Sequence, residues 1–348
     1  MRILQICSPF LPTQGGREVM VDTLCRELSL RGHEILVATD TQVEREMDLP
    51  YGVMRMGESN MEQSLDKIRR FKPEVVNLHT FDSALIASQI KSEKKTVFTF
   101  HNAHISINNP VSRFMVRWVD KNVDTIVAVS DFVHSTIIAS DDFPSVQVER
   151  RWNGVMAPAE PNEIGTDLVF TGRLSSEKGV GVLLLAFEQV LSKHPKTALK
   201  IIGDGPYRQA LESIAKRLGV FESTQFLGWM NQSELSKELF TARAMIVPSV
   251  WQEPFGLVAV EAMMHGVPVI ASDVGGLREI VVDQESGYLV APGDHFKMAE
   301  RISTLLSDRP LAKKMGQKGL ERANLLFSAS RMAEDYEEIY MNVVTNEE

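Results

Sequence analysis

Apolar and polar positions alternate along the chain with two different periods. Short apolar runs predict buried strands, and the stretches between them repeat apolar residues at helical spacing, as in Glu18–Leu30 and Met61–Phe71. This succession of strands and helices is typical of α/β proteins with parallel sheets. In the first half the predicted strands are Arg2–Cys7, Glu34–Ala38, Val75–Leu78, Thr96–Phe100 and Thr125–Val129.

The second half repeats the same succession. Helices are predicted over Val182–Ser192, Tyr207–Leu218 and Glu234–Phe240. The closing stretch, Ala312–Val344, is charged, has apolar residues at helical spacing, and is long enough to fold back across the first half. The predicted strands of this half are Leu168–Thr171, Leu199–Ile202, Thr224–Phe226, Met245–Val247 and Val267–Ala271.

Between the halves, Asn153–Asn162 holds turn-forming residues and no periodic pattern, which indicates a linker. We therefore predict an α/β protein of two Rossmann-like domains that face each other across a deep cleft. The first would span residues 1–155 and the second residues 156–328, with a C-terminal helix at about 329–348 packed back on the first. Open parallel sheets bind ligands beyond the carboxyl ends of their strands, so the functional residues should lie in those loops.

Composition narrows the class of protein. The 348 residues suffice for two domains, and a formal charge of −9 argues against a nucleic-acid partner, which calls for a basic surface. Cys7 and Cys25 fall in core-like segments, so reduced buried thiols are expected. No apolar stretch approaches the ~20 residues that span a bilayer, and no targeting segment is evident. These features predict a soluble, cytoplasmic protein.

Two carboxylates enclose an apolar run at Glu253–Glu261, with the sequence EPFGLVAVE. Pro254 and Gly256 favour a helix start near Leu257, so Glu261 would lie on a helix that is apolar almost all round. Glu253 would lie at the helix entrance, where free backbone N–H groups attract anions. The spacing suits a ligand with two hydroxyl-rich parts and phosphate between them. The alternative is a pair of structural acids, each bonded to an Arg or Lys.

Glycine-containing loops follow several predicted strands. In the segment GRLSSEKG, which runs from Gly172 to Gly179, Arg173 and Lys178 precede a helix whose dipole opposes cations. A bound diphosphate would explain both charges, whereas a solvated loop paired with Glu177 is the alternative. Two further loops of this kind, which contain Gly15 with Gly16 and Gly203, are each also open to being a plain turn, and the backbone near Leu227 could bond a flat base.

His101 follows the predicted strand Thr96–Phe100, at its carboxyl end. A histidine there can bond a sugar hydroxyl or carry a proton near neutral pH. Its spacing from His104 is not a metal-binding pattern, and no Asp-x-Asp pair is present. We therefore expect no metal; Arg173, Lys178 and helix N-termini would hold a diphosphate instead.

Together these motifs resemble the family 4 (group 1) nucleotide-sugar-dependent glycosyltransferases, which have the two-domain GT-B fold. The pair of acids with seven residues between them and the upstream GRLSSEKG segment are highly specific for that family. The first half matches only in its glycine loop, its histidine and its layout. The matching residues are Gly15, Gly16, His101, Asn153, Gly154, Gly172–Gly179, Gly203–Pro206 and Glu253–Glu261.

The resemblance implies a role for each residue. Arg173 and Lys178 would hold the donor diphosphate, and Glu261 the ribose hydroxyls. Glu253 would hold the donor sugar's hydroxyls, and His101 would lie beside that sugar. The Gly16 backbone would approach the phosphate or the acceptor from the first domain. The backbone N–H groups that would assist Glu253 belong to Phe255, Gly256 and Leu257.

The resemblance also implies transfer of a sugar to an acceptor hydroxyl with retention of configuration, in cell-envelope or exopolysaccharide assembly. The acceptor would be a glycan, a lipid-linked molecule or a small molecule. A nucleotide-sugar epimerase or hydrolase, and a silent donor-binding subunit, are alternatives. The run Val111–Lys121 carries a basic stripe with aromatic residues, so contact with the inner face of a membrane through residues 111–121 is a further hypothesis.

Overall fold

The computed structural model describes residues 1–13, 15–45, 47–57, 61–90, 95–104, 110–158 and 165–345. The chain folds into two compact units. Unit 1 comprises Met1–Gly154 together with Ala329–Glu348, and unit 2 comprises Val155–Ser328. The last helix therefore belongs to the unit in which the chain begins.

Unit 1 is built on a seven-stranded sheet in the order β3-β2-β1-β4-β5-β6-β7, with every neighbouring pair parallel. The strand order reverses between β1 and β4, which is the place where open parallel sheets bind ligands. The strands are β1 (Arg2–Ile6), β2 (Glu34–Thr39), β3 (Gly52–Arg55), β4 (Val75–Leu78), β5 (Lys95–Phe100), β6 (Thr125–Ala128) and β7 (Gln147–Arg150).

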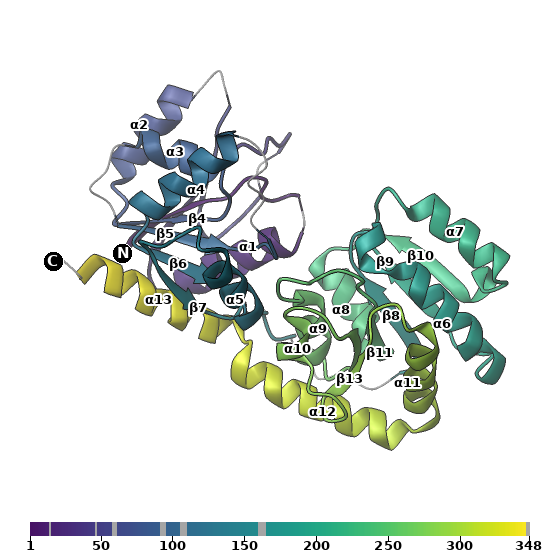
Figure 1. Cartoon of the computed structure of the whole chain (residues 1–348). Helices are drawn as coiled ribbons and strands as arrows, with labels where there is room; N and C mark the ends of the chain where they lie inside the picture. Colours follow the sequence, from purple (N-terminus) through teal and green to yellow (C-terminus); the bar gives the residue numbers. More distant parts are fainter. Residues whose placement is uncertain are drawn as a thin grey trace. The chain divides into compact units, whose positions relative to one another are not determined.

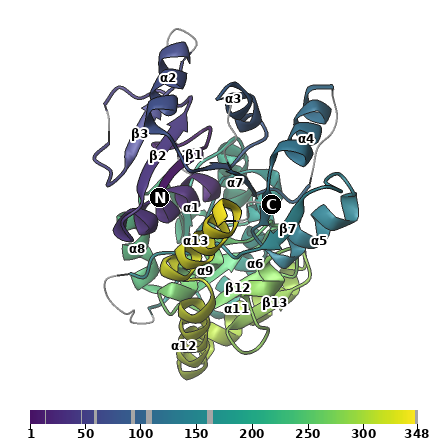
Figure 2. The same cartoon turned by 90° about the vertical axis from the view of Figure 1, so that its left-hand side faces the viewer.

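The helices of unit 1 connect and cover these strands (Figure 1). The long last helix, α13, packs against α1 and β5, and Figure 2 shows it lying over α1. The helices are α1 (Gly16–Leu30), α2 (Met61–Phe71), α3 (Ser83–Gln89), α4 (Pro110–Asn122), α5 (Asp131–Ser140) and α13 (Ala329–Thr345).

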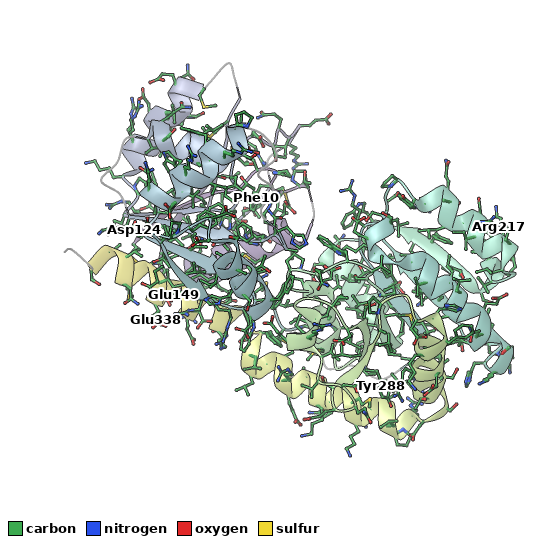
Figure 3. The ribbon with its side chains drawn as sticks, in the orientation of Figure 1. Phe10, Asp124, Glu149, Arg217, Tyr288 and Glu338 are labelled. Atoms are coloured by element: carbon green, nitrogen blue, oxygen red, sulfur yellow. The ribbon has the colours of Figure 1, made fainter. Side chains whose placement is uncertain are left out.

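Ion pairs along one side of α13 hold it on unit 1. Arg31 at the end of α1 bonds Glu337 at 2.9 Å. Arg151 lies 2.8 Å from Glu149 and 3.7 Å from Glu338, and Figure 3 shows these two acids on β7 and α13. Two fully buried tyrosines on the opposite side of α13 face the sheet, so the helix is anchored by both charge and burial.

Unit 2 has a six-stranded parallel sheet in the order β10-β9-β8-β11-β12-β13. Its order reverses between β8 and β11, so the loops after these two strands are where a ligand is expected. The strands are β8 (Asp167–Thr171), β9 (Leu199–Ile202), β10 (Thr224–Gly228), β11 (Ala242–Val247), β12 (Val269–Ser272) and β13 (Gly287–Val290).

The main core of unit 2 joins the sheet to α6 and α11, with side chains such as Phe170, Phe187 and Ile302 fully or almost fully buried. In Figure 1, α6 and α11 lie together, and α12 runs beside α9. The helices are α6 (Val180–Lys193), α7 (Arg208–Arg217), α8 (Gln232–Phe240), α9 (Leu257–Met264), α10 (Leu277–Ile280), α11 (His295–Ser307) and α12 (Arg309–Leu326).

The predicted α/β class and the parallel sheets are confirmed, and one detail differs from expectation. The closing stretch, Ala312–Val344, breaks at Phe327–Ser328 between α12 of unit 2 and α13 of unit 1, and α13 begins at Ala329, where a C-terminal helix was expected. Three further strands, β3, β7 and β13, lie at sheet edges, where one side lacks a partner strand. Part of the linker predicted at Asn153–Asn162 lies outside the described residues.

Candidate functional site

The loops after β8 and β11 are packed against each other at the point where the strand order of unit 2 reverses. Val250 N donates to Glu177 O at 2.9 Å, which joins the two loops. Gly179 has φ +68°, and a Cβ there would lie 1.9 Å from the Pro248 carbonyl oxygen. Only glycine fits this close approach, so the sequence allows the two loops to bring their side chains together.

Lys178 and Glu253, one from each loop, form an ion pair. Lys178 Nζ lies 2.6 Å from Glu253 Oε1, and the same oxygen accepts from Ser249 Oγ at 2.6 Å and from Trp251 Nε1 at 3.0 Å. The Glu253 side chain is buried. No hydrogen bond joins Glu253 Oε2 to another residue that the structure describes, so this oxygen is free to accept from a ligand.

The alternative pairing of Lys178 with Glu177 is not what the structure shows. The Glu177 carboxylate instead accepts from Ser175 Oγ at 2.6 Å, and this hydrogen bond lowers the pKa of Glu177. Arg173 is exposed, and no ion pair or hydrogen bond links its guanidinium to another described residue. A short 3₁₀ turn over Ser176–Lys178 precedes α6, so Lys178 stands just before that helix. Lys178 is thus paired with Glu253, whereas Arg173 has no ion-pair partner among the described residues.

Glu261 lies on α9, which is buried on nearly every side. Among the described residues, its carboxylate accepts a hydrogen bond only from Gln232, whose Nε2 lies 3.4 Å from Oε1. Burial raises the pKa of Glu261 to about 7, and the Gln232 bond offsets this only partly. A buried carboxylate so poorly satisfied is costly, and hydroxyl donors from a ligand would relieve that cost.

The start of α9 presents backbone donors. Gly256 has φ +115°, and a Cβ there would lie 2.6 Å from Leu277 Cδ2, so a side chain would be strained. Among the described residues, no group accepts from the N–H of Phe255, Gly256 or Leu257. These predicted donor-binding residues thus follow Glu253 directly, with their N–H groups free.

The predicted glycines of the neighbouring strands also come together. Gly203 N donates to Gly228 O at 2.7 Å, and a Cβ on Gly203 would lie 2.0 Å from the Gly172 carbonyl oxygen. Gly172 and Gly203 have φ values of +149° and +124°. Leu227 lies next to them on β10, and its side chain is half-buried. The ends of β8, β9 and β10 therefore bring their backbones together at one place.

In unit 1, Gly15 and Gly16 form the start of α1. Gly15 is the N-cap and has an extended backbone, so its conformation does not require glycine. The next two residues, Arg17 and Glu18, form an ion pair at 2.7 Å, and Arg17 Nη2 also donates to the Ser8 carbonyl at 3.3 Å. Glu18 lies in the first turn of α1, where its negative charge interacts favourably with the helix dipole.

His101 lies just after β5, and its Nε2 is 3.0 Å from Nδ1 of His79. Burial, assisted by the positive charge of Arg17, lowers the pKa of His101 to about 3. The ring is therefore neutral at physiological pH and acts as a hydrogen-bonding group, so the proton-carrying option is not favoured. Sequence analysis missed His79, although it follows the strand Val75–Leu78 just as His101 follows Thr96–Phe100.

The structure thus divides the predicted catalytic and donor-binding residues between the two units. Gly15, Gly16 and His101 belong to unit 1, and all the others belong to unit 2. Cys7 and Cys25 are free and buried, as expected. In the parts of the chain that are described, no three or more His, Cys, Asp or Glu side chains are placed to hold a metal ion. None of the described helices has the length and apolar character needed to cross a membrane.

Known proteins match both units. The family described as Glycosyltransferase Family 4 matches residues 14–156, and Glycosyl transferases group 1 matches residues 157–322. A glycogen synthase of Mycobacterium tuberculosis is 28% identical, over 78% of this chain and 70% of that protein. A phosphatidyl-myo-inositol mannosyltransferase of Mycobacterium leprae is 27% identical, over 99% of this chain and 98% of that protein.

Solved structures match the fold over almost the whole chain. The crystal structure of Anabaena Alr3699/HepE in complex with UDP-glucose has a TM-score of 0.84 at 20% identity, covering 98% of this chain and 100% of that one. Sucrose-phosphate synthase from Thermosynechococcus elongatus has a TM-score of 0.81 at 22% identity, covering 98% of both chains. The chain is a nucleotide-sugar glycosyltransferase of the GT-B fold and belongs to family 4, group 1.

Proposed function

We propose that the loops after β8 and β11 bind the diphosphate and the sugar of the donor. The observation that carries this proposal is the Lys178–Glu253 pair at 2.6 Å, with the open cation Arg173 on the same loop. Arg173 supplies a bidentate fork and Lys178 a point charge for the diphosphate. The free Oε2 of Glu253 and the N–H groups of Phe255, Gly256 and Leu257 then bond the donor sugar's hydroxyls.

Glu261 is proposed to bond the ribose. Two ribose hydroxyls can donate to one carboxylate, which would replace the weak Gln232 contact with strong charge-assisted bonds. The backbone of Gly172, Gly203 and Leu227 is proposed to line the nucleotide. In unit 1, the Gly15–Gly16 backbone is proposed to approach the phosphate or the acceptor. His101 is proposed to lie beside the donor sugar.

The reaction is proposed to retain the anomeric configuration and to need no divalent metal. The bond from the anomeric carbon to the diphosphate oxygen breaks, and the acceptor oxygen bonds that carbon on the same face. The acceptor's proton passes to the leaving phosphate oxygen. Arg173 and Lys178 stabilise the negative charge that develops on the diphosphate, which is the usual source of catalysis when no enzyme nucleophile takes part.

A thermal-shift panel tests the donor site. UDP-, GDP- and ADP-sugars are compared with the free nucleotides, with and without chelator, on the wild type and on Lys178→Ala. We expect one donor to stabilise the wild type in chelator and to lose that effect in Lys178→Ala. No shift with any nucleotide at millimolar concentration, or a shift that needs magnesium or manganese, contradicts the proposal.

The stereochemistry is tested on the product. With the selected donor and an acceptor, NMR of the new glycosidic bond is expected to show the anomeric configuration of the donor. The inverted anomer contradicts retention. Release of free sugar without transfer, in the presence of competent acceptors, would instead indicate a hydrolase.

The setting is proposed to be cell-envelope or exopolysaccharide assembly, with a glycan or lipid-linked acceptor at an anionic membrane surface. In α4, Val111 and Phe114 are each 57% exposed, whereas Met115 and Val119 are buried. The three basic residues of the stripe are all exposed, so apolar and cationic groups share the free face of the helix, as in helices that lie on membranes. They are Arg113, Arg117 and Lys121.

Sedimentation with anionic and neutral liposomes at low salt tests this surface. We expect the wild type to sediment with the anionic vesicles only, and the double variant Arg113→Ala/Arg117→Ala to remain in the supernatant. A control that removes exposed charge elsewhere, Lys318→Ala on α12, should sediment like the wild type. A wild type that stays wholly in the supernatant contradicts membrane contact.

A further inference from the structure

A chain of hydrogen-bonded side chains crosses the core of unit 1, from His101 to the last helix. His101 Nε2 lies 3.0 Å from His79 Nδ1, and His79 Nε2 lies 2.7 Å from Gln5 Oε1. Gln5 Nε2 then donates to the hydroxyl of Tyr340, on α13, at 3.1 Å. Asn77 Nδ2 donates to the same hydroxyl at 2.8 Å.

A second branch of the chain ends one turn earlier on α13. Thr99 Oγ1 donates to Asn77 Oδ1 at 3.0 Å, and Tyr336 donates its hydroxyl to Thr99 at 3.2 Å. This branch reaches Tyr340 only through Asn77. It therefore offers a comparison: the two tyrosines share a helix and full burial, but only Tyr340 touches the glutamine next to His79.

These polar groups occupy the central strands of the sheet. Gln5 on β1 is the register partner of Asn77 on β4, and Thr99 lies on β5 beyond them. All three are fully buried, and His79 is 3% exposed. Polar side chains in such a core are tolerated only when their hydrogen bonds are made, so the chain must keep one consistent direction of donors and acceptors.

The amide of Gln5 sets that direction. Its oxygen can only accept, so His79 must carry its proton on Nε2. Burial lowers the pKa of His79 well below its usual value, and a neutral imidazole has one proton. His79 Nδ1 is therefore bare and accepts from His101 Nε2–H. By the same reasoning, the neutral His101 has a bare Nδ1, and no hydrogen bond joins that atom to another described residue.

We infer that His79, Gln5 and Tyr340 are positioning residues that hold His101 as the Nε2–H tautomer, with Nδ1 presented as a hydrogen-bond acceptor. The Tyr340 hydroxyl accepts a hydrogen bond from Gln5 Nε2, and this bond keeps the amide oxygen turned towards His79. The last helix thereby controls which nitrogen of His101 can meet a ligand. A bare nitrogen selects a donor such as a sugar hydroxyl and rejects a carbonyl or phosphate oxygen.

The tautomer is a property of the free protein, whereas its effect on turnover rests on the proposed function. In the tautomer that the hydrogen-bonded side chains select, a donor-sugar hydroxyl would donate to Nδ1 of His101. In the other tautomer the same hydroxyl would face an N–H group. Losing the selection is expected to lower kcat/KM by about tenfold, the size of one well-placed hydrogen bond. For a donor that lacks this hydroxyl, KM should not change when the selection of the tautomer is lost.

The test uses the full chain with ¹⁵N-labelled histidine and long-range ¹H–¹⁵N correlation spectra at neutral pH without ligand. Signals are assigned with His79→Gln and His101→Gln. We expect both histidines of the wild type to carry the proton on Nε2. A proton on Nδ1 of His101 in the wild type overturns the inference.

The matched pair Tyr340→Phe and Tyr336→Phe tests the role of the last helix. Tyr340→Phe is expected to shift the His79 and His101 signals towards a mixture of tautomers, and Tyr336→Phe to leave them as in the wild type. Equal responses, or none in Tyr340→Phe, would overturn the positioning role. If the spectra respond and kcat/KM does not, the tautomer selection stands and the proposed contact of His101 with the donor sugar fails.

Discussion

The two units share a parallel sheet but place their polar groups differently. In unit 2 the ion pair of the site, Lys178–Glu253, joins two loops beyond the strands. In unit 1 the hydrogen-bonded chain is made of neutral groups that lie within or directly after the strands, as in Gln5, Asn77 and His101. A charge inside a sheet core would cost several kcal/mol, so unit 1 uses groups that hydrogen bonds alone can satisfy.

The difference predicts different behaviour on mutation. Groups at a loop site should affect catalysis far more than stability, because partial exposure lets water replace them. Groups in a buried chain should affect stability and geometry first, because a lost partner leaves an unsatisfied atom in the core.

The largest effect is expected for the ion pair of unit 2. Lys178→Ala or Glu253→Ala should lower kcat/KM by about 1,000-fold or more, because both are proposed to act on the reacting end of the donor. Steady-state kinetics measures the change, with circular dichroism to confirm folding. The matched control is Lys200→Ala, which removes another part-buried lysine, paired with Asp167 at the opposite end of the strands. A near-wild-type rate in a folded Lys178→Ala protein would refute the placement of the site.

Arg173→Ala should have a smaller effect on rate and none on stability. The guanidinium is exposed and has no ion-pair partner among the described residues, so its removal breaks no internal contact. We expect kcat/KM to fall by about 10- to 100-fold with an unchanged melting temperature. A lowered melting temperature without ligand would show that Arg173 has a structural role instead.

Glu261 should make stability depend on pH in a defined window. Burial raises its pKa from 4.5 to about 7, so between these values the folded protein binds more protons than the unfolded chain. Stability should therefore fall as pH rises from about 4.5 to 7 and stay level above, by about 3 kcal/mol at most. Glu261→Gln should remove this fall and melt higher than the wild type at pH 8 but not at pH 4.5. Parallel melting curves for the two proteins across that range would contradict the assignment.

The smallest effect is expected for the tyrosines of α13. Tyr340→Phe leaves two buried amide groups, of Gln5 and Asn77, without their acceptor, and should lower the free energy of unfolding by about 2 kcal/mol or more. Tyr336→Phe removes one donor to Thr99 and should cost about 1 kcal/mol. Urea unfolding measures both, and equal costs would show that Tyr340 is not the more important acceptor.

Sequence analysis was most successful where hydrophobic runs are continuous. The central strands Val75–Leu78 and Leu199–Ile202 were predicted with their observed bounds, because both faces of a central strand are buried. The edge strands β3 and β7 were missed because few of their residues are buried, as in the largely unburied Gln147–Arg150. The edge strand β13 was missed although most of its residues are buried. The start of the last helix near residue 329 was predicted, although helical spacing continues on both sides of the break at Phe327–Ser328.

For the candidate site, the local motifs indicated which loops to examine but not how their side chains pair. That Lys178 bonds Glu253 rather than Glu177 depends on the contact between loops 75 residues apart. His79 gave no signal by itself, because a single histidine after a strand is common. Its role follows only from its distance to His101 and Gln5.

The sequence by itself determined the α/β class, the two sheets, the glycines where backbones approach and the residue types of the donor site. These depend on local periodicity and on spacing within short segments, which the chain carries in order. Tertiary structure decided what depends on long-range contacts: the ion pairs and buried tyrosines that hold α13 on unit 1, the ion pair between two loops, and the neutral chain that ends at Tyr340. Such contacts join residues up to 335 positions apart, and no local pattern encodes which of them meet.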